Sequence, residues 1–169
     1  MIKAAGQTYK QTRQFRYLGG LVTEDGELTQ EINNRSRAAW ACIRRFSREL
    51  FDRRTAPWEL KVRLLKAEAM EALLYGCMTW APHRENYRFL GTVHHRLPLR
   101  FIGYYRLRGT YRQLSYAQAL NKTGCQSAEA IVRQQRLLFA GALARKQDGR
   151  LPQRLTFGTL LAGEEDPGP

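Results

Sequence analysis

Apolar residues between positions 28 and 52 recur at the spacing of one face of an α-helix. Successive intervals of seven, four, three and four residues separate Ile32, Ala39, Ile43, Phe46 and Leu50. This spacing predicts an amphipathic helix over 28–52 with a narrow buried stripe. Its other side is rich in arginine, with seven arginines but few acids between positions 35 and 54. A solvated face is one reading; contact with a polyanion is the other, through Arg37, Arg44 and Arg48.

Two further apolar patterns predict helices over residues 57–78 and 84–102. Thr55 and Pro57 are start signals for the first helix, which is apolar almost all round. Its expected core stripe is Leu60, Leu64, Ala67, Leu74 and Cys77. The stripe expected in the second helix is Tyr87, Leu90, His94, Leu97 and Phe101. Pro98 lies inside this helix and is expected to kink or split it.

The two ends of the chain follow different patterns. Residues 7–23 contain Tyr, Phe, Val and Thr around Gly19-Gly20, which predicts a β-hairpin or short strand pair. Near the other end, helices are predicted around 113–121 and over 127–147, and the core candidates in the latter are Ile131, Gln134, Leu138 and Leu143. The predicted fold class is mainly α: a helical bundle of about five helices preceded by a short N-terminal β-hairpin.

The chain carries a large excess of positive charge. Its 169 residues have a net charge of +13 and a pI near 10.2, with 22 arginines against 6 lysines. Arginine pairs with phosphate through a planar fork and stacks on bases. Neutralised phosphates also release counterions, which favours binding. A polyanionic partner is therefore expected, although part of this charge will be solvated or paired with acids.

Residues 86–128 are the most informative stretch for function. These 43 residues contain no Asp or Glu, and arginines alternate with aromatic residues. Exposed rings can stack on unpaired bases while arginine neutralises the backbone. The alternative for many of these rings, Tyr87 and Phe101 above all, is a place in the core. The residues predicted to contact nucleic acid are Arg96, Arg100, Tyr104, Tyr105, Arg106, Arg108 and Arg112.

No catalytic or metal-binding constellation is recognisable. Two-metal polymerisation requires clustered carboxylates, but no two of the four aspartates, at positions 25, 52, 148 and 166, are adjacent. P-loop, GxSxG and GxGxxG motifs are absent. His94 and His95 lack nearby cysteines, so a core-facing His94 and an exposed His95 are expected rather than zinc ligands. Independent catalysis is not expected.

The cysteines and the chain termini indicate an intracellular protein. Cys42, Cys77 and Cys125 are widely spaced, as is typical of reduced structural thiols. No apolar run reaches membrane-spanning length, and the first residues lack the apolar stretch of a signal peptide. The abrupt, strand-like start is expected of a fragment of a longer protein.

Four segments of the chain, at residues 15–35, 73–80, 93–103 and 133–158, carry recognisable motifs. In this order and spacing they resemble the reverse transcriptases of non-LTR (LINE-like) retrotransposons. The first reads FRYLGGLVTEDGELTQEINNR at 15–35 and is similar to the F-x-YLG segment after that family's catalytic palm. The second reads LLYGCMTW at 73–80 and the third VHHRLPLRFIG at 93–103. The last reads RQQRLLFAGALARKQDGRLPQRLTFG at 133–158. The resemblance covers roughly residues 10–160, nearly the whole chain.

This resemblance implies the region just C-terminal to the palm. Residues 1–26 would be an end-of-palm-like β-hairpin and 27–110 a thumb-like helical region. Residues 111–158 would be a C-terminal helical extension and 159–169 a disordered tail. The implied partners are RNA or an RNA–DNA duplex, and the upstream palm and fingers of the same polyprotein. The implied location is nuclear or ribonucleoprotein-associated.

The resemblance also implies roles for particular residues. The hairpin would form the primer-grip region near the primer terminus, through Tyr17, Leu18 and Gly19. The palm's aspartate pair, with its Mg²⁺, would lie upstream, so no cofactor is assigned to this chain. Pro98, Leu99 and Ala142 depart from the family pattern, which has Leu, Arg and His there. The alternatives are a helical protein-interaction module and a nonfunctional truncated retroelement remnant.

Overall fold

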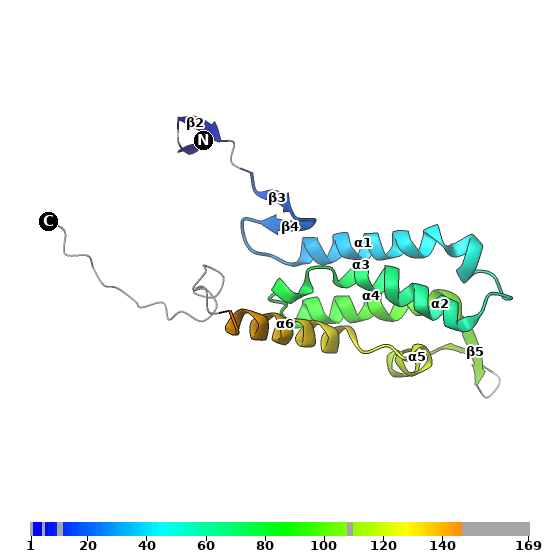
Figure 1. Ribbon diagram of the computed structural model, residues 1–169. Coiled ribbons are helices and arrows are strands. Elements are labelled where there is room, and N and C mark those ends of the chain that lie inside the picture. The colour runs from blue at the N-terminus through cyan, green and yellow to red at the C-terminus, as the bar shows by residue number, and fades with distance from the viewer. Residues whose placement is uncertain (1, 5, 10–11, 108–109, 147–169) are drawn as a thin grey trace.

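Most of the described chain is helical (Figure 1), which confirms the mainly α fold class. The computed structural model describes residues 2–4, 6–9, 12–107 and 110–146. Its helical elements are α1 (Thr29–Arg45), η1 (Ser47–Phe51), α2 (Trp58–Leu64), η2 (Leu65–Met70), α3 (Glu71–Leu74), η3 (Cys77–Thr79), α4 (Arg84–Ile102), α5 (Tyr116–Thr123) and α6 (Ala128–Ala144). Its strands are β1 (Ile2–Ala4), β2 (Gln7–Tyr9), β3 (Gln14–Tyr17), β4 (Gly20–Thr23), β5 (Tyr104–Leu107) and β6 (Thr110–Gln113).

The long helices lie side by side as a bundle (Figure 1). α1 packs against η2, α3 and α4, while α6 lies along α4 and covers η3. The β3–β4 hairpin stands at one end of the bundle, beside the start of α1, and β5–β6 stands at the other end. These positions separate the primer-grip-like residues from the β5–β6 arginines by the length of the bundle.

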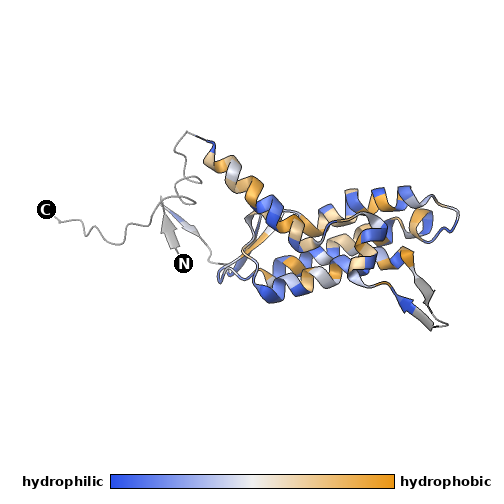
Figure 2. Ribbon diagram, turned by 90° about the horizontal axis from the view of Figure 1, so that it is seen from below, coloured by the Kyte–Doolittle hydropathy of each residue, from blue (hydrophilic) through white to orange (hydrophobic). Residues whose placement is uncertain are grey.

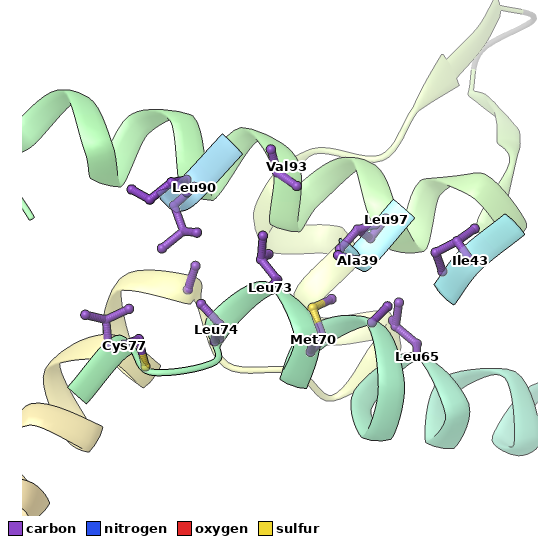
Figure 3. Packing of buried hydrophobic residues seen from close by; sticks show 14 of the residues in the cluster. Ala39, Ile43, Leu65, Met70, Leu73, Leu74, Cys77, Leu90, Val93 and Leu97 are labelled. Carbon is purple, nitrogen blue, oxygen red and sulfur yellow. The ribbon is translucent and has the colours of Figure 1, made fainter. Parts of the chain in front are cut away.

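The hydrophobic core forms where α1, η2, α3 and α4 meet (Figure 3). Burying each of its large aliphatic side chains stabilises the fold by roughly 1.5–3 kcal/mol. The largest apolar side chains that are fully buried are Ile32, Ile43, Leu65, Leu73, Leu90, Leu97 and Val132.

The helix predicted over 28–52 is present as α1 followed at once by η1, a π-helical turn. The predicted stripe is confirmed, because Ile32, Ala39, Ile43 and Leu50 are buried and Phe46 packs against the core. Lys61 stabilises the end of η1: its Nζ donates hydrogen bonds to the carbonyl oxygens of Phe51 (3.1 Å) and Arg53 (2.6 Å). A lysine in this position satisfies carbonyls that a helix end leaves unpaired.

The helix predicted over 57–78 is present as a continuous run of α2, η2 and α3, which ends before Gly76. Two of its predicted core positions are wrong, since Leu60 is 48% exposed and Ala67 is also exposed. The cause is the π-helical segment η2, which has more residues per turn than an α-helix. The buried residues therefore recur every four positions: Lys61, Leu65, Ala69 and Leu73. Leu74 and Cys77 are buried as predicted.

Pro98 does not split the third helix. α4 runs from Arg84 to Ile102 with Pro98 buried inside it. The core stripe is confirmed at Leu90, His94 and Leu97, which are almost wholly buried. Leu97 belongs to the hydrophobic core cluster and Pro98 is buried beside it in sequence, so the fold keeps the chain helical across the missing backbone hydrogen bond. Tertiary packing thus overrides the local preference of proline.

The described residues form three antiparallel hairpins where one was predicted. The range 7–23 contains the β3–β4 hairpin and also β2, which pairs with β1 ahead of that range in a separate two-stranded sheet. The third hairpin, β5–β6, follows α4 and was not predicted. Its YYRL and TYRQ strands carry aromatic residues that favour β-structure. The sequence prediction for this stretch rested on its charge pattern and concerned nucleic-acid contacts only.

The last two helices were predicted with small errors of position. α5 begins at Tyr116 after Ser115, whose side chain caps the helix by accepting from the Gln118 amide. α6 spans Ala128–Ala144, close to the predicted 127–147. Within α6, Leu143 is buried and Ile131 half-buried, but Gln134 and Leu138 are exposed, so those two core predictions are wrong. The C-terminal half of α6 extends beyond the bundle (Figure 2), and Leu138 is 57% exposed.

Candidate nucleic-acid interface

Arg37, Arg44 and Arg48 lie on one exposed face of α1 and η1. The core residues of the same helix point to the other side, so α1 has the buried and exposed faces that its periodicity predicted. Within the described residues, none of the three has a carboxylate at ion-pairing distance. At 1.5 Å per residue, they extend over about 16 Å of helix. We call this row the α1 arginine stripe.

The arginines of α4 have mixed surroundings. Arg96 is exposed, and no ion pair of its side chain is found in the described chain. Arg100 instead forms an ion pair with Asp52, with Nη1 2.8 Å from Oδ1, which ties the end of α4 to the end of η1. The Arg100 side chain is 46% exposed, so it reaches solvent while it is paired. Both residues remain predicted contacts, and Arg100 has a competing structural role.

The β5–β6 hairpin holds the rest of the predicted arginine and tyrosine cluster. In its ladder Tyr105 lies opposite Arg112, and Arg106 lies opposite Tyr111. Arg112 is exposed. The backbones of Tyr104, Tyr105 and Arg106 belong to β5. Arg108 lies outside the described residues.

The primer-grip-like residues form the tip of the β3–β4 hairpin. Tyr17 ends β3, and Leu18 and Gly19 are the two residues of the turn. Both turn residues have positive φ, 47° for Leu18 and 84° for Gly19, as in a type I′ hairpin turn. Glycine adopts this conformation freely, but a left-handed leucine is strained by roughly 1–2 kcal/mol. Tyr17 and Leu18 are 62% and 77% exposed, so the tip presents apolar side chains to solvent.

A polar cluster on α1 and the loop after α3 holds this turn. Arg35 donates to Glu31, with Nε 2.6 Å from Oε1, and its Nη2 donates to the Gly19 carbonyl. The guanidinium carbon of Arg35 lies 4.4 Å from the centre of the Tyr75 ring. The Tyr75 hydroxyl donates to the Leu18 carbonyl oxygen at 3.2 Å. We call Glu31, Arg35 and Tyr75 the turn lock.

The sequence assigned no role to the turn lock. Glu31 is an acid in the first turn of α1, yet it is only 5% exposed. A signal was present: Arg35 comes three residues after Ile32 and four before Ala39, so it lies nearer the apolar stripe than the exposed arginines. Glu31 and Arg35 also have the i,i+4 spacing of a helical ion pair. No local signal could have placed Tyr75 beside Leu18, 57 residues earlier in the chain.

A groove of about 750 Å³ opens beside the hairpin. Its walls come from β4, the first turn of α1, the segment 74–81 and two residues of α6, Ile131 and Gln135. The segments FRYLGG and LLYGCMTW, far apart in sequence, therefore meet at one site.

His94 is buried in a hydrogen-bond network between α4, α5 and α6. Its Nδ1 lies 3.2 Å from the Tyr116 hydroxyl, which also accepts from the Ala128 amide at 3.0 Å. Burial, with a smaller contribution from neighbouring His95, lowers the pKa of His94 to about 4. His94 is thus core-facing as predicted. His95 is half-buried rather than exposed, with Nε2 2.8 Å from the Leu114 carbonyl oxygen.

Metal ligation and thiol chemistry are the remaining possibilities for the titratable groups. Over the described ranges, no three His, Cys, Asp or Glu side chains come together in a way that could hold a metal ion. Cys42, Cys77 and Cys125 are free thiols, and burial raises the pKa of Cys42 and Cys77. A search of the described residues finds no helix long and apolar enough to cross a membrane.

Comparison with known proteins places this chain near a transposon-derived relative. It is 27% identical over 143 residues to an uncharacterized transposon-derived protein of Caenorhabditis elegans. The match covers 85% of this chain and 50% of that protein, so the chain spans about half the length of this relative. This likeness supports an origin in a transposable element. The chain matches no family model, and no solved structure matches it with significance.

Proposed function

We propose that this chain is the template–primer-binding portion of a retroelement RNA-directed DNA polymerase, and that it lacks the catalytic aspartates. The observation that carries the proposal is the α1 arginine stripe: three exposed arginines, unpaired within the described chain, on a protein of net charge +13. The transposon-derived relative and the four resembling segments support the same assignment. The ligand is RNA or an RNA–DNA duplex, bound through its backbone.

The upstream palm and fingers are the proposed protein partner. They would supply the aspartate pair and its Mg²⁺, so the proposal gives this chain no cofactor and no catalytic residue. The β3–β4 hairpin supports a partner at this end of the bundle. Its strands pair only with each other in the described chain, and Phe15 and Val22 are 50% and 43% exposed. Such free edges and exposed apolar residues favour pairing with a further strand. A nuclear or ribonucleoprotein location follows from the same proposal.

Binding through phosphates should depend steeply on salt, and the α1 arginine stripe should set part of that dependence. Replacing Arg37, Arg44 and Arg48 together with alanine is expected to reduce the slope of log affinity against log salt concentration by about 2–3, since each phosphate contact contributes about 0.9. Fluorescence anisotropy with a labelled RNA–DNA duplex at several salt concentrations measures this slope.

The matched control removes the same charge from arginines that already have partners. Arg53, Arg88 and Arg133 form exposed ion pairs with Glu49, Glu85 and Glu129. The triple alanine variant of these residues should keep a slope within about one unit of the wild type. Equal slopes for the two triple variants would show that net charge, not the stripe, governs binding.

The β5–β6 hairpin is expected to contact the backbone rather than the bases. Replacing Arg106 and Arg108 with alanine should weaken binding by a similar factor for duplexes of unrelated sequence, because phosphate contacts carry little sequence information. A panel of duplexes that differ only in sequence provides the measurement. A changed sequence preference with an unchanged salt slope would contradict backbone contact.

A protein-interaction module is the second candidate function. The observation in its favour is the exposed apolar surface of α6, where Leu137 and Leu138 are 74% and 57% exposed on the part that extends from the bundle (Figure 2). In this case binding would follow a protein and be indifferent to nucleic acid. Affinity capture with and without nuclease separates the two candidates.

A further inference from the structure

The groove beside the β3–β4 hairpin has the opposite charge to the protein as a whole. Its ionisable wall residues are Glu27, Glu31, Arg35 and Glu71. Arg35 and Glu31 pair with each other. Glu27 and Glu71 are exposed, and neither has a cation at ion-pairing distance among the described residues. Three carboxylates against one guanidinium leave the groove a formal charge of −2 on a chain of net charge +13. Such a surface repels phosphates and attracts cations.

The rest of the groove wall is rich in apolar side chains. They come from β4, the start of α1, α3, the segment after α3 and α6, and they include Leu21, Leu28, Leu74, Met78, Trp80 and Ile131. Met78 is 40% exposed, so part of this apolar wall faces solvent. The groove volume of about 750 Å³ lies within the range of sites that hold ligands in proteins. An occupant that combines apolar side chains with positive charge would match both properties of the wall.

The chain carries a segment of this chemistry shortly after α6. Residues 150–158, which lie outside the described ranges, read RLPQRLTFG. Arg150 and Arg154 give this segment a formal charge of +2, and it contains no acid. Its large apolar residues are Leu151, Leu155 and Phe157. The charge and the apolar residues of 150–158 therefore complement the wall of the groove.

α6 leads this segment to the groove. Ile131 and Gln135 lie in the groove wall, and Leu138 continues the same helix face with 57% of its surface exposed. The helix runs toward the hairpin end of the bundle (Figure 1), and it ends at Ala144, about 14 Å beyond Gln135. Leu155 comes eleven residues after Ala144, and an extended chain of this length spans up to about 36 Å. Leu155 is therefore within reach of the groove of its own chain.

We propose that residues 150–158 dock in this groove of the same chain, with their apolar side chains on its apolar wall and their two arginines near Glu27 and Glu71. The docked segment connects the end of α6 to the β3–β4 hairpin and covers Met78. This contact goes beyond the proposed function, because it involves no nucleic acid and would form in its absence.

Trypsin cleavage of the full chain tests the docking. The bond after Arg154 can be cut only while the segment is out of the groove, so its cleavage rate follows the undocked population. Replacing Glu27 and Glu71 together with glutamine should raise this rate about fivefold, since two exposed ion pairs are lost. Mass spectrometry of the fragment that ends at Arg154 gives the rate.

The matched control neutralises two acids outside the groove. Glu59 and Glu68 are exposed and do not line it. Their double glutamine variant should keep the wild-type cleavage rate at Arg154. Equal rates in the wild type and the Glu27, Glu71 variant would overturn the proposal.

A labelled synthetic peptide of residues 147–160 tests the apolar part of the contact. In the full chain with Leu155→Asp and Phe157→Asp, the chain's own segment should no longer fill the groove. This variant should bind the peptide about tenfold more tightly than the wild type, whose groove is occupied. Adding Glu27→Gln and Glu71→Gln to it should weaken peptide binding about fivefold. Fluorescence anisotropy measures both changes, and equal affinity or no binding in the wild type and the first variant would contradict the docking.

The dependence on protein concentration separates docking within one chain from docking between chains. Docking within one chain protects the bond after Arg154 equally at low and high protein concentration. Protection that appears only at high concentration would assign the groove to a second copy and overturn the proposal. Rapid cleavage at every concentration, in the wild type and the variants alike, would leave the groove to a separate partner and would also overturn it.

Discussion

Acidification from pH 7 to pH 4 is expected to remove about 3 kcal/mol of the protein's stability through His94 alone. The imidazole has an ordinary pKa of 6.5 in the unfolded chain, and burial lowers this pKa to about 4 in the folded chain. Between these values the unfolded state binds the proton and the folded state does not. Stability is therefore full above about pH 6.5 and is lost as the pH falls toward 4.

The surroundings of His94 explain why the folded state resists protonation. The ring is almost wholly buried, and its Nε2 has no hydrogen-bond partner among the described residues. Since the Tyr116 hydroxyl accepts from the Ala128 amide, its proton points to Nδ1 of His94. This arrangement suits a neutral imidazole. A charged His94 ring would have Tyr116 and His95 as its neighbours. Neither of these side chains supplies a negative charge that would compensate it.

Urea unfolding at pH 7 and pH 4.5 measures this effect. The loss of stability on acidification should shrink in His94→Gln, because glutamine can accept from Tyr116 but does not titrate. His95→Gln is the matched control and should keep most of the loss, since His95 is only half-buried. Equal acid sensitivity in His94→Gln and the wild type would refute the assignment.

Replacing Leu73 with alanine is expected to lower the free energy of unfolding by about 3 kcal/mol. Leu73 is fully buried and lies in the middle of the core, where α3 faces α1 and α4 (Figure 3). The substitution removes apolar contacts and leaves a cavity that the surrounding helices fill only in part. For a chain of 169 residues this corresponds to a fall in Tm of roughly 6–12 °C.

Leu137→Ala provides the control for the same chemical change. Leu137 is 74% exposed, so its loss should change the free energy of unfolding by less than about 0.5 kcal/mol. Thermal unfolding followed by circular dichroism measures both variants. A large effect at Leu137 would mean that another part of the protein, or a second copy, covers this surface of α6 in solution.

Periodicity predicted the fold well where one helix buries one regular stripe. α1 and α4 have their core residues where the spacing placed them. Arg37, Arg44 and Arg48 are exposed, as the same helical periodicity predicted. The prediction failed where the local geometry departs from 3.6 residues per turn, as the exposed Ala67 in the π-helical segment η2 shows. It also failed in α6, because Leu138 belongs to an apolar segment that the described core does not cover.

The candidate site was predictable only in its separate parts. The FRYLGG turn and the arginine-rich helix were each recognisable in the sequence. The contact between Tyr75 and Leu18 was not, because residue spacing tells which side chains share a face and not which distant element faces them. For the same reason the sequence does not show that Glu31 accepts a hydrogen bond from the Leu21 amide.

The sequence by itself determined that the chain is mainly helical, that α1 has a buried stripe and an arginine face, and that its aspartates form no adjacent pair. Only the tertiary structure decided that α4 continues through Pro98, that η2 shifts the buried register, and that the turn lock fixes the hairpin tip. The difference has one physical cause. Amphipathic spacing is a local property of the chain, whereas packing against a buried proline or across 57 residues depends on contacts that form only when the whole bundle assembles.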